Sequence, residues 1–169
     1  MKTLSTLALL TAATAAQAYT LDINVGHSKL SGTYDDVNVI GLGVGSHLNN
    51  EFHLGLNVSR KSIYEATNVD AKATSATLDL TYSLSPVGGI RPFIGAGVGA
   101  VRFTGDSIFT KNALATKFFV GLAFPITQNI EFSVSAQNSK FHGVQVLEND
   151  ITKSTVTSWD GIAALRFNF

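Results

Sequence analysis

The feature that most limits how this chain can fold is an alternation of apolar and polar residues that recurs along its length. Alternation with period two is typical of a β-strand that has one apolar and one polar face. The chain also ends inside such a segment, Leu165–Phe169, which closes on an aromatic residue. Two all-β architectures fit this pattern: a soluble sandwich whose apolar faces meet inside, and a barrel whose apolar faces turn outward to lipid.

Eight segments carry the alternation, and each has roughly the ten residues that a tilted strand needs to cross a bilayer. We expect these strands at Tyr19–Ser28, Val37–Leu48, Phe52–Lys61, Ala73–Leu84, Arg91–Thr104, Ala113–Phe124, Asn129–Phe141 and Lys153–Phe169. In the fifth strand we expect Ile94, Ala96 and Val98 to face lipid and the glycines between them to face inward. Phe93 and Phe103 lie on the opposite parity, so a β-bulge or the reverse assignment stays open there.

The connections between these segments alternate between short and long. The short ones are Asn49–Glu51, Ser85–Gly89 and Pro125–Thr127, and the long polar ones are Lys29–Asp36, Ser62–Lys72, Gly105–Asn112 and His142–Ile151. Transmembrane barrels have short periplasmic turns and longer extracellular loops, whereas a soluble meander has no reason to sort its loops by length. We therefore predict an all-β, eight-stranded antiparallel up-and-down transmembrane β-barrel.

Aromatic residues gather toward the two ends of the predicted strands, as expected of girdles at two membrane interfaces. Beside the short turns and the C-terminus lie Phe52, Tyr82, Phe93, Phe124, Phe132, Phe167 and Phe169. At or near the other end lie Tyr34, Tyr64, Phe103, Phe141 and Trp159. A sandwich core would instead concentrate its aromatic residues in mid-strand, so the distribution favours the barrel.

The first 18 residues have the layout of a secretory signal peptide. Lys2 gives a positive start, an apolar run follows from Leu4 to Ala13, and Ala16-Gln17-Ala18 has the small-x-small form of a cleavage site. We expect cleavage after Ala18, which leaves a single exported barrel domain at residues 19–169. The chain has 12 basic and 12 acidic residues and no cysteine, so its composition indicates no nucleic-acid partner and no disulfide framework.

The interior of an eight-stranded barrel is only wide enough for side chains to fill. The charged residues expected to face it are Asp22, Asp79, Lys117, Glu131, Asp160 and Arg166. We expect Asp22, Glu131 and Arg166 to cluster near the periplasmic end. Asp79 and Lys117 are expected nearer mid-height, where they could pair across the lumen. Buried charges must be paired or solvated, so such a set more often plugs a lumen than conducts.

With the segments Arg91–Gly99 and Leu165–Phe169 in place, the mature chain resembles the small eight-stranded outer-membrane β-barrel families of Gram-negative bacteria. These include the opacity-protein group, the transmembrane domain of outer-membrane protein A, and the adhesion and invasion barrels. The resemblance implies a location in the bacterial cell outer membrane and recognition of the C-terminal Phe169 by the barrel-assembly machinery. It implies little about activity, because these families share one scaffold across unrelated tasks.

Basic residues near the outer rim are candidates for contacts with lipid and with lipopolysaccharide phosphates. They are Lys29, Arg60, Lys61, Lys72 and Arg102. The four histidines lack metal-ligand spacing, so we expect no metal and no cofactor. A lipid A-modifying enzyme could use His142 with Ser139 or Ser28, but no acidic partner is placed with them, so we expect no enzymatic activity.

The function that these observations favour is an integral surface barrel of structural or adhesion type with a polar plug in its lumen. Its loops would contact a host surface, phage or envelope protein. The loop at His142–Ile151 is expected to project as a hairpin, because Val144 and Val146 alternate with polar residues. A narrow porin-like channel for small solutes is the alternative, and a lipid A-modifying enzyme is the third.

Overall fold

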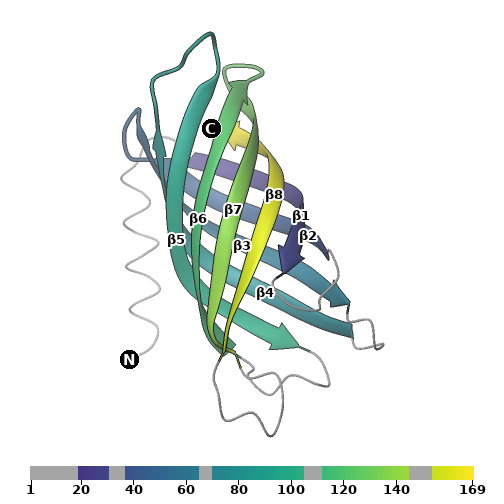
Figure 1. Cartoon of the computed structure of the whole chain (residues 1–169). Helices are drawn as coiled ribbons and strands as arrows, with labels where there is room; N and C mark the ends of the chain where they lie inside the picture. The colour runs from purple at the N-terminus through teal and green to yellow at the C-terminus, as the bar shows by residue number, and fades with distance from the viewer. Residues whose placement is uncertain (1–18, 31–36, 65–69, 105–111, 145–153) are drawn as a thin grey trace, which may run out of the picture.

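The described residues form eight antiparallel strands that close into one barrel in chain order (Figure 1). The computed structural model describes residues 19–30, 37–64, 70–104, 112–144 and 154–169. The strands are β1 (Tyr19–Leu30), β2 (Val37–His47), β3 (Phe52–Tyr64), β4 (Asp70–Ser83), β5 (Arg91–Thr104), β6 (Asn112–Pro125), β7 (Ile130–Val144) and β8 (Ser154–Asn168). Among these residues there is no helix that is long and apolar enough to cross a membrane.

The eight strands predicted from the alternation are confirmed, with differences at their ends. β1, β3, β4 and β7 run two or three residues further toward the long connections than the sequence indicated. Backbone pairing continues there through residues such as Lys29 and Ser62, whose side chains no longer alternate between apolar and polar. Pairing of backbone amides needs no apolar side chain, so the pattern ends before the strand does.

The barrel is closed by pairing of β1 with β8 along their length, from Thr20–Asn168 to Leu30–Ser158. The row of paired residues that starts at Thr20 passes once around all eight strands and returns to β1 at Leu30, a shift of ten residues. Such a stagger tilts the strands, and with eight strands the interior is just wide enough for side chains to fill it. We call the end with the connections 48–51, 84–90 and 126–129 the short-turn end, and the opposite end the long-loop end.

Along most of each strand, apolar side chains face outward and polar side chains face inward. The outward residues Ile40, Leu42 and Val98 are 60%, 58% and 52% exposed. The buried polar side chains include Thr77, Asp79 and Thr81 on β4, which alternate with the outward-facing Leu78 and Leu80. A soluble sandwich would bury the apolar set instead, because apolar burial drives its folding. The architecture is therefore a barrel of transmembrane type.

Strand β5 has an unbroken register with both neighbours, so it carries no bulge. Ile94, Ala96 and Val98 face outward and the glycines between them face inward, as predicted. Phe93 follows the inward parity and packs against Phe119 inside the barrel, with ring centroids 6.3 Å apart. Its assignment to the aromatic girdle was wrong.

Inward-facing glycines explain how the lumen accommodates the Phe93 ring. A Cβ placed on Gly121 would lie 2.5 Å from the Phe93 ring, and one on Gly95 would contact the ring of Phe119. The two rings therefore occupy volume that side chains at these positions would otherwise fill. Because β5 and β6 each leave such a gap, the rings of Phe93 and Phe119 fit inside the barrel.

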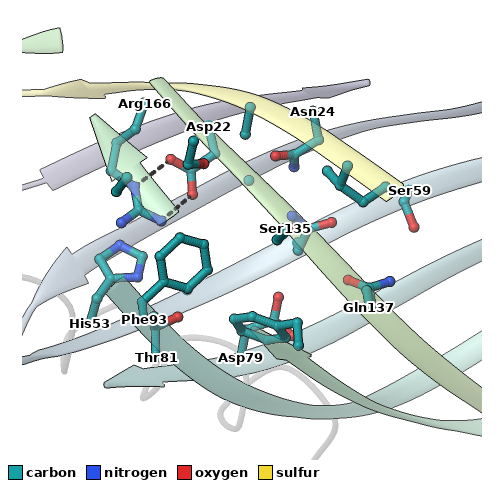
Figure 2. A pocket seen from close by; sticks show the side chains of 18 of the residues that line it. Asp22, Asn24, His53, Ser59, Asp79, Thr81, Phe93, Ser135, Gln137 and Arg166 are labelled. Atoms are coloured by element: carbon teal, nitrogen blue, oxygen red, sulfur yellow. Dashed lines mark hydrogen bonds and ion pairs between the residues drawn. The ribbon is translucent and has the colours of Figure 1, made fainter. Parts of the chain in front are cut away.

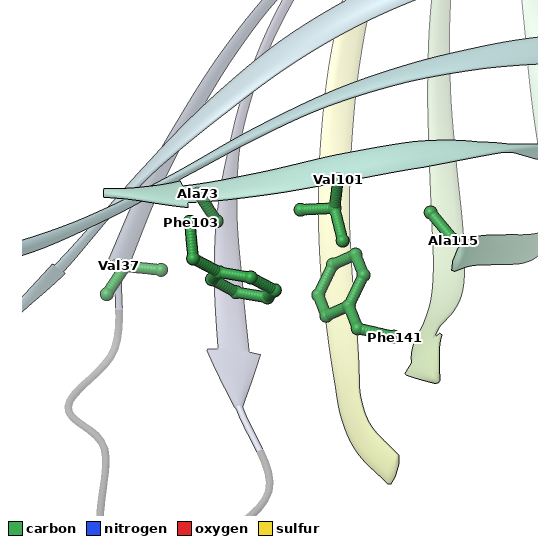
Figure 3. Packing of buried hydrophobic residues seen from close by; sticks show 6 residues of the cluster. All are labelled: Val37, Ala73, Val101, Phe103, Ala115 and Phe141. Carbon is green, nitrogen blue, oxygen red and sulfur yellow. The ribbon is translucent and has the colours of Figure 1, made fainter. Parts of the chain in front are cut away.

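An apolar cluster fills the lumen at the long-loop end (Figure 3). It consists of Val37, Ala73, Val101, Phe103, Ala115 and Phe141. The rings of Phe103 and Phe141 meet edge to face, with centroids 5.8 Å apart. Both residues were expected in the outer girdle and are instead buried inside the barrel, because their parity is that of the inward face.

Other predicted girdle residues do face outward. At the short-turn end, Phe52 lies against Tyr82 and Phe124 against Phe132, as cross-strand pairs on the outer wall. Phe167 has the outward parity of β8, and Phe169 is exposed. Trp159 faces outward toward the long-loop end and is 63% exposed. Tyr34 lies outside the described residues, and so does the side chain of Tyr64.

Candidate functional site

Near the short-turn end, the lumen holds the cluster of charges expected from the sequence. Arg166 donates two hydrogen bonds to Asp22, at 2.7 Å from Nε to Oδ1 and 3.0 Å from Nη2 to Oδ2. The same guanidinium lies 3.9 Å from Oε1 of Glu131. Arg91 adds a fourth member, 3.4 Å from Oε2 of Glu131. Arg91 was not among the charged residues expected in the lumen. It has the same parity as Phe93, and the sequence left open whether this parity of the fifth strand faces the lumen or the lipid.

Asp79 and Lys117 form an ion pair of 2.6 Å near the middle of the barrel. They lie on β4 and β6 and reach each other over Gly97 of the intervening β5, with which both are in register. A Cβ at Gly97 would contact Oδ1 of Asp79 and lie 2.8 Å from Cε of Lys117. The pair predicted from the sequence therefore forms, but along the wall over one neighbouring strand and not across the lumen.

Toward the long-loop end, Lys61 and Asp160 form the most deeply buried ion pair of the described residues. Nζ of Lys61 lies 2.7 Å from both carboxylate oxygens of Asp160, and the two side chains are only 4% and 0% exposed. Nζ also donates to Ser158 at 2.8 Å and to Ser28 at 3.4 Å. The charge lies 5.6 Å from the centre of the Phe141 ring, so the ion pair adjoins the apolar cluster.

The predicted contact of Lys61 with lipopolysaccharide was wrong, because this side chain points into the barrel. Lys61 shares its parity on β3 with His53, Asn57 and Ser59, which all line the interior. The other four predicted rim residues, Lys29, Arg60, Lys72 and Arg102, are exposed on the outer wall. The alternation within β3 could have shown that Arg60 faces outward and Lys61 faces inward.

The charges of the lumen balance one another. The described inward-facing strand residues include four cations (Lys61, Arg91, Lys117 and Arg166) and four carboxylates (Asp22, Asp79, Glu131 and Asp160), and every one belongs to an ion pair. Removal of a charge from water is costly unless an opposite charge and hydrogen bonds replace the water. Each of these inward charges therefore has an opposite charge beside it that offsets part of the lost hydration.

A polar cavity of about 100 Å³ lies in the lumen, where the charge cluster of Asp22, Glu131 and Arg166 forms part of its lining (Figure 2). Its lining includes Asp22, Asn24, Asp79 and Gln137. Nδ2 of Asn24 and Oδ1 of Asp79 are buried and have no hydrogen-bond partner among the described residues. Because a buried donor or acceptor normally finds a partner, these two atoms suit hydration by water in a cavity of this size.

Two histidines at the short-turn end connect the first and last strands to the β2–β3 hairpin. The rings of His47 and His53 meet edge to face at 5.0 Å. Nε2 of His53 lies 2.8 Å from the hydroxyl of Thr20 on β1, and Nε2 of His47 lies 3.4 Å from Oδ1 of Asn168 on β8. These residues carry no motif, so nothing in the sequence marks them as a pair.

The groups considered for an enzyme lie on opposite faces of the barrel wall. Ser139 and Ser28 face inward, where Ser139 donates to Asp160 and Ser28 accepts from Lys61. His142 has the outward parity of β7, and its Nε2 lies 2.9 Å from the hydroxyl of Thr116. The described residues contain no group of three or more His, Cys, Asp or Glu that could hold a metal ion.

Comparison with known proteins places the whole arrangement in context. The family model for the outer membrane protein beta-barrel domain matches residues 3–158. The crystal structure of Neisserial surface protein A (NspA) has a TM-score of 0.75 and 17% identity, and covers 90% of this chain and 99% of its own. Ail, the attachment invasion locus protein of Yersinia pestis, has a TM-score of 0.54 and 14% identity, with 91% and 99% covered.

The outer membrane enzyme PagL is a third similar structure, with a TM-score of 0.55, 15% identity, and coverage of 86% of this chain and 97% of its own. At these identities the likeness shows the fold and not the activity. Comparison of the sequence with curated proteins finds no match.

Proposed function

Because the chain belongs to the outer membrane protein β-barrel family, we propose that it is a non-enzymatic surface barrel whose external loops contact other surfaces. The family places the protein in the bacterial outer membrane. In this membrane the long-loop end faces outward and the short-turn end faces the periplasm, as in other barrels of this kind. Removal of residues 1–18 as a signal peptide and recognition of Phe169 by the assembly machinery belong to the same proposal.

The observation that carries the proposal is the set of side chains packed inside the barrel at the long-loop end. The apolar cluster around Phe103 and Phe141, together with the buried Lys61–Asp160 pair, occupies the interior just where the external connections leave the strands. A lumen filled in this way supports a rigid shell and not a solute path. Contacts with partners then depend on the four connections 31–36, 65–69, 105–111 and 145–153, which lie outside the described residues.

Deletion of Gly143–Asp150 tests the loop assignment. The shortened protein should still fold, shown by heat-modifiable migration on gels, and bacteria that carry it should lose adhesion to epithelial cells. A second variant, in which the order of residues 145–150 is scrambled, keeps the length and charge of this segment and tests whether adhesion depends on its specific sequence. It should lose adhesion as well. Unchanged adhesion by the deletion variant would refute the assignment.

A narrow channel is the second candidate, and the polar cavity favours it. This cavity extends from residues near the short-turn end, such as Ser83 and Glu131, up to Lys117. A solute that entered from the periplasm would still meet the Lys61–Asp160 pair and the apolar cluster before it reached the outside. Conductance of the purified protein in planar bilayers separates the two candidates, since a steady open pore would overturn the plugged lumen.

Because the outer membrane enzyme PagL has a similar fold, an enzymatic activity is a further possibility to test, with lipid A as the substrate considered from the sequence. We propose the absence of such activity because Ser139 and Ser28 lie inside the wall and His142 lies outside it. Mass spectrometry of lipid A from cells with and without the protein should give the same spectrum. A mass shift that depends on the protein would establish an enzyme.

A further inference from the structure

We propose that Arg60, Lys72 and Arg102 together form a site for the phosphate groups of a membrane glycolipid of the lipopolysaccharide class, on the outer wall of the barrel. The proposal rests on the outer-membrane location and not on the loop contacts proposed above. It concerns one defined patch on β3, β4 and β5, which the strand register brings together.

The three cations lie on the same face of three adjacent strands. Arg60 is in register with Thr74 of β4, and Thr74 is in register with Arg102 of β5. Lys72 lies two residues from Thr74 on the same outward parity and pairs with Thr104. Because adjacent strands are about 4.8 Å apart, the two arginines are about 10 Å apart at their backbones. Their side chains are long enough to reach one group above Thr74.

The charges of the strands are sorted between the two faces of the wall. Each strand carboxylate whose side chain the structure describes (Asp22, Asp79, Glu131 and Asp160) faces inward and is paired with an inward cation. The outward-facing described charges of the strands are all basic: Lys29, Arg60, Lys72, Arg102 and Lys140. Among the described residues of the wall, the three clustered cations therefore have no acidic partner.

The height of the cluster matches the level of lipid headgroups. On the side of the short-turn end, the next outward residues are Val58 on β3, Ala76 on β4 and Ala100 on β5, which are in register with one another and exposed on the outer wall. The larger apolar residues Leu78 and Val98 follow them and are exposed as well. The cluster thus lies where the apolar band of the outer wall ends and before the strands reach the long connections. Cations are costly within the hydrocarbon but not at its boundary, where long side chains reach the headgroups.

The lipid-facing position decides the kind of ligand. A soluble anion would have to enter the membrane boundary to reach Arg60 and Arg102, whereas a phosphate on an amphiphile is held at this level by its acyl chains. A phosphate monoester carries up to two negative charges and suits arginine, which can bind two oxygens at once. Three converging cations therefore suit a phosphorylated glycolipid better than a single-charge headgroup.

The test uses the full mature chain refolded in detergent, and the probe is lipid A with its phosphates intact. Native mass spectrometry counts the bound lipid, and its dissociation constant is compared between variants. The double variant R60Q/R102Q should bind about tenfold more weakly or worse, since charged hydrogen bonds are lost. K140Q is the matched control, because Lys140 is also an outward cation near the long-loop end but lies on β7, away from the cluster. It should bind as the unaltered protein does.

Two further arms identify the ligand chemistry. Enzymatically dephosphorylated lipid A should lose most of its binding, and inorganic phosphate at millimolar concentration should fail to compete. Equal binding by R60Q/R102Q or by dephosphorylated lipid would overturn the proposal, and full competition by inorganic phosphate would replace the glycolipid site by a free-phosphate site. Deletion of Gly143–Asp150 spares all three cations, so a failure of the adhesion proposal is measured separately.

Discussion

Arg60 and Lys61 are neighbours in the chain and lie on opposite faces of the barrel wall. The guanidinium of Arg60 is exposed on the outer wall, whereas Lys61 is 3% exposed and its Nζ lies 2.7 Å from both oxygens of Asp160. Period-two geometry separates the two charges. One is left for a ligand outside the barrel and the other belongs to its core.

Loss of either member of the Lys61–Asp160 pair should destabilise the barrel strongly. K61M or D160N leaves one buried partner without its counter-charge, which typically costs about 3–5 kcal/mol. The free energy of unfolding can be measured by urea titration in lipid vesicles, followed by the fluorescence of Trp159, the single tryptophan of the chain. The double variant K61M/D160L should recover much of the loss. Single variants as stable as the unaltered protein would show that the pair contributes little.

Arg166 should matter more than Arg91, although both contact Glu131. Arg166 makes two short bonds to Asp22, while the contact of Arg91 is 3.4 Å long and its side chain is more exposed. We expect R166Q to lower the free energy of unfolding by about 2–4 kcal/mol and R91Q by about 1 kcal/mol or less. The same urea titration compares them. An equal loss in both variants would contradict the difference in geometry.

Gly97 should resist substitution because the Asp79–Lys117 pair passes over it. G97A places a methyl group against both side chains, so the pair must separate, and we expect a loss of about 2 kcal/mol. G161A is the control, since a Cβ at Gly161 has no atom within 4 Å. Its stability should change by less than about 0.5 kcal/mol. If the two substitutions had equal effects, crowding at Gly97 could not be the cause.

The apolar cluster should keep the outer end of the lumen closed. The unaltered protein should show no steady conductance in planar bilayers. The double variant F103A/F141A removes the two rings that meet at 5.8 Å, and should show measurable ion current. F118A removes an outward-facing ring instead and should remain closed. Steady current through the unaltered protein would mean that these rings do not seal it.

Much of this architecture could be predicted from the sequence, because in a membrane barrel the side-chain period and the face of the wall are linked. Leu42, Val58 and Leu78 follow one rule, since lipid accepts every apolar side chain on the outward parity. The same rule placed Asp22, Asp79 and Arg166 inside and brought them near their partners. These parts of the molecule depend on local alternation alone.

The errors have a common physical origin. Phe93, Phe103 and Phe141 are apolar, and this residue type suggested that their side chains face lipid. Their position in the alternation is that of the inward face, however, and it places them in the lumen. Inward glycines create the space that such rings fill, and this complementarity between neighbouring strands depends on the register, which one strand does not reveal. Lys61 was misplaced because its rim position was given more weight than its parity on β3.

The central claim is that the apolar faces of the strands contact lipid, and Trp159 reports on it directly. This single tryptophan is 63% exposed on the outer wall toward the long-loop end. In vesicles that contain lipids brominated near the headgroup, its fluorescence should be strongly quenched, while acrylamide in the aqueous phase should quench it weakly. Strong quenching by acrylamide with no effect of the brominated lipids would contradict the account.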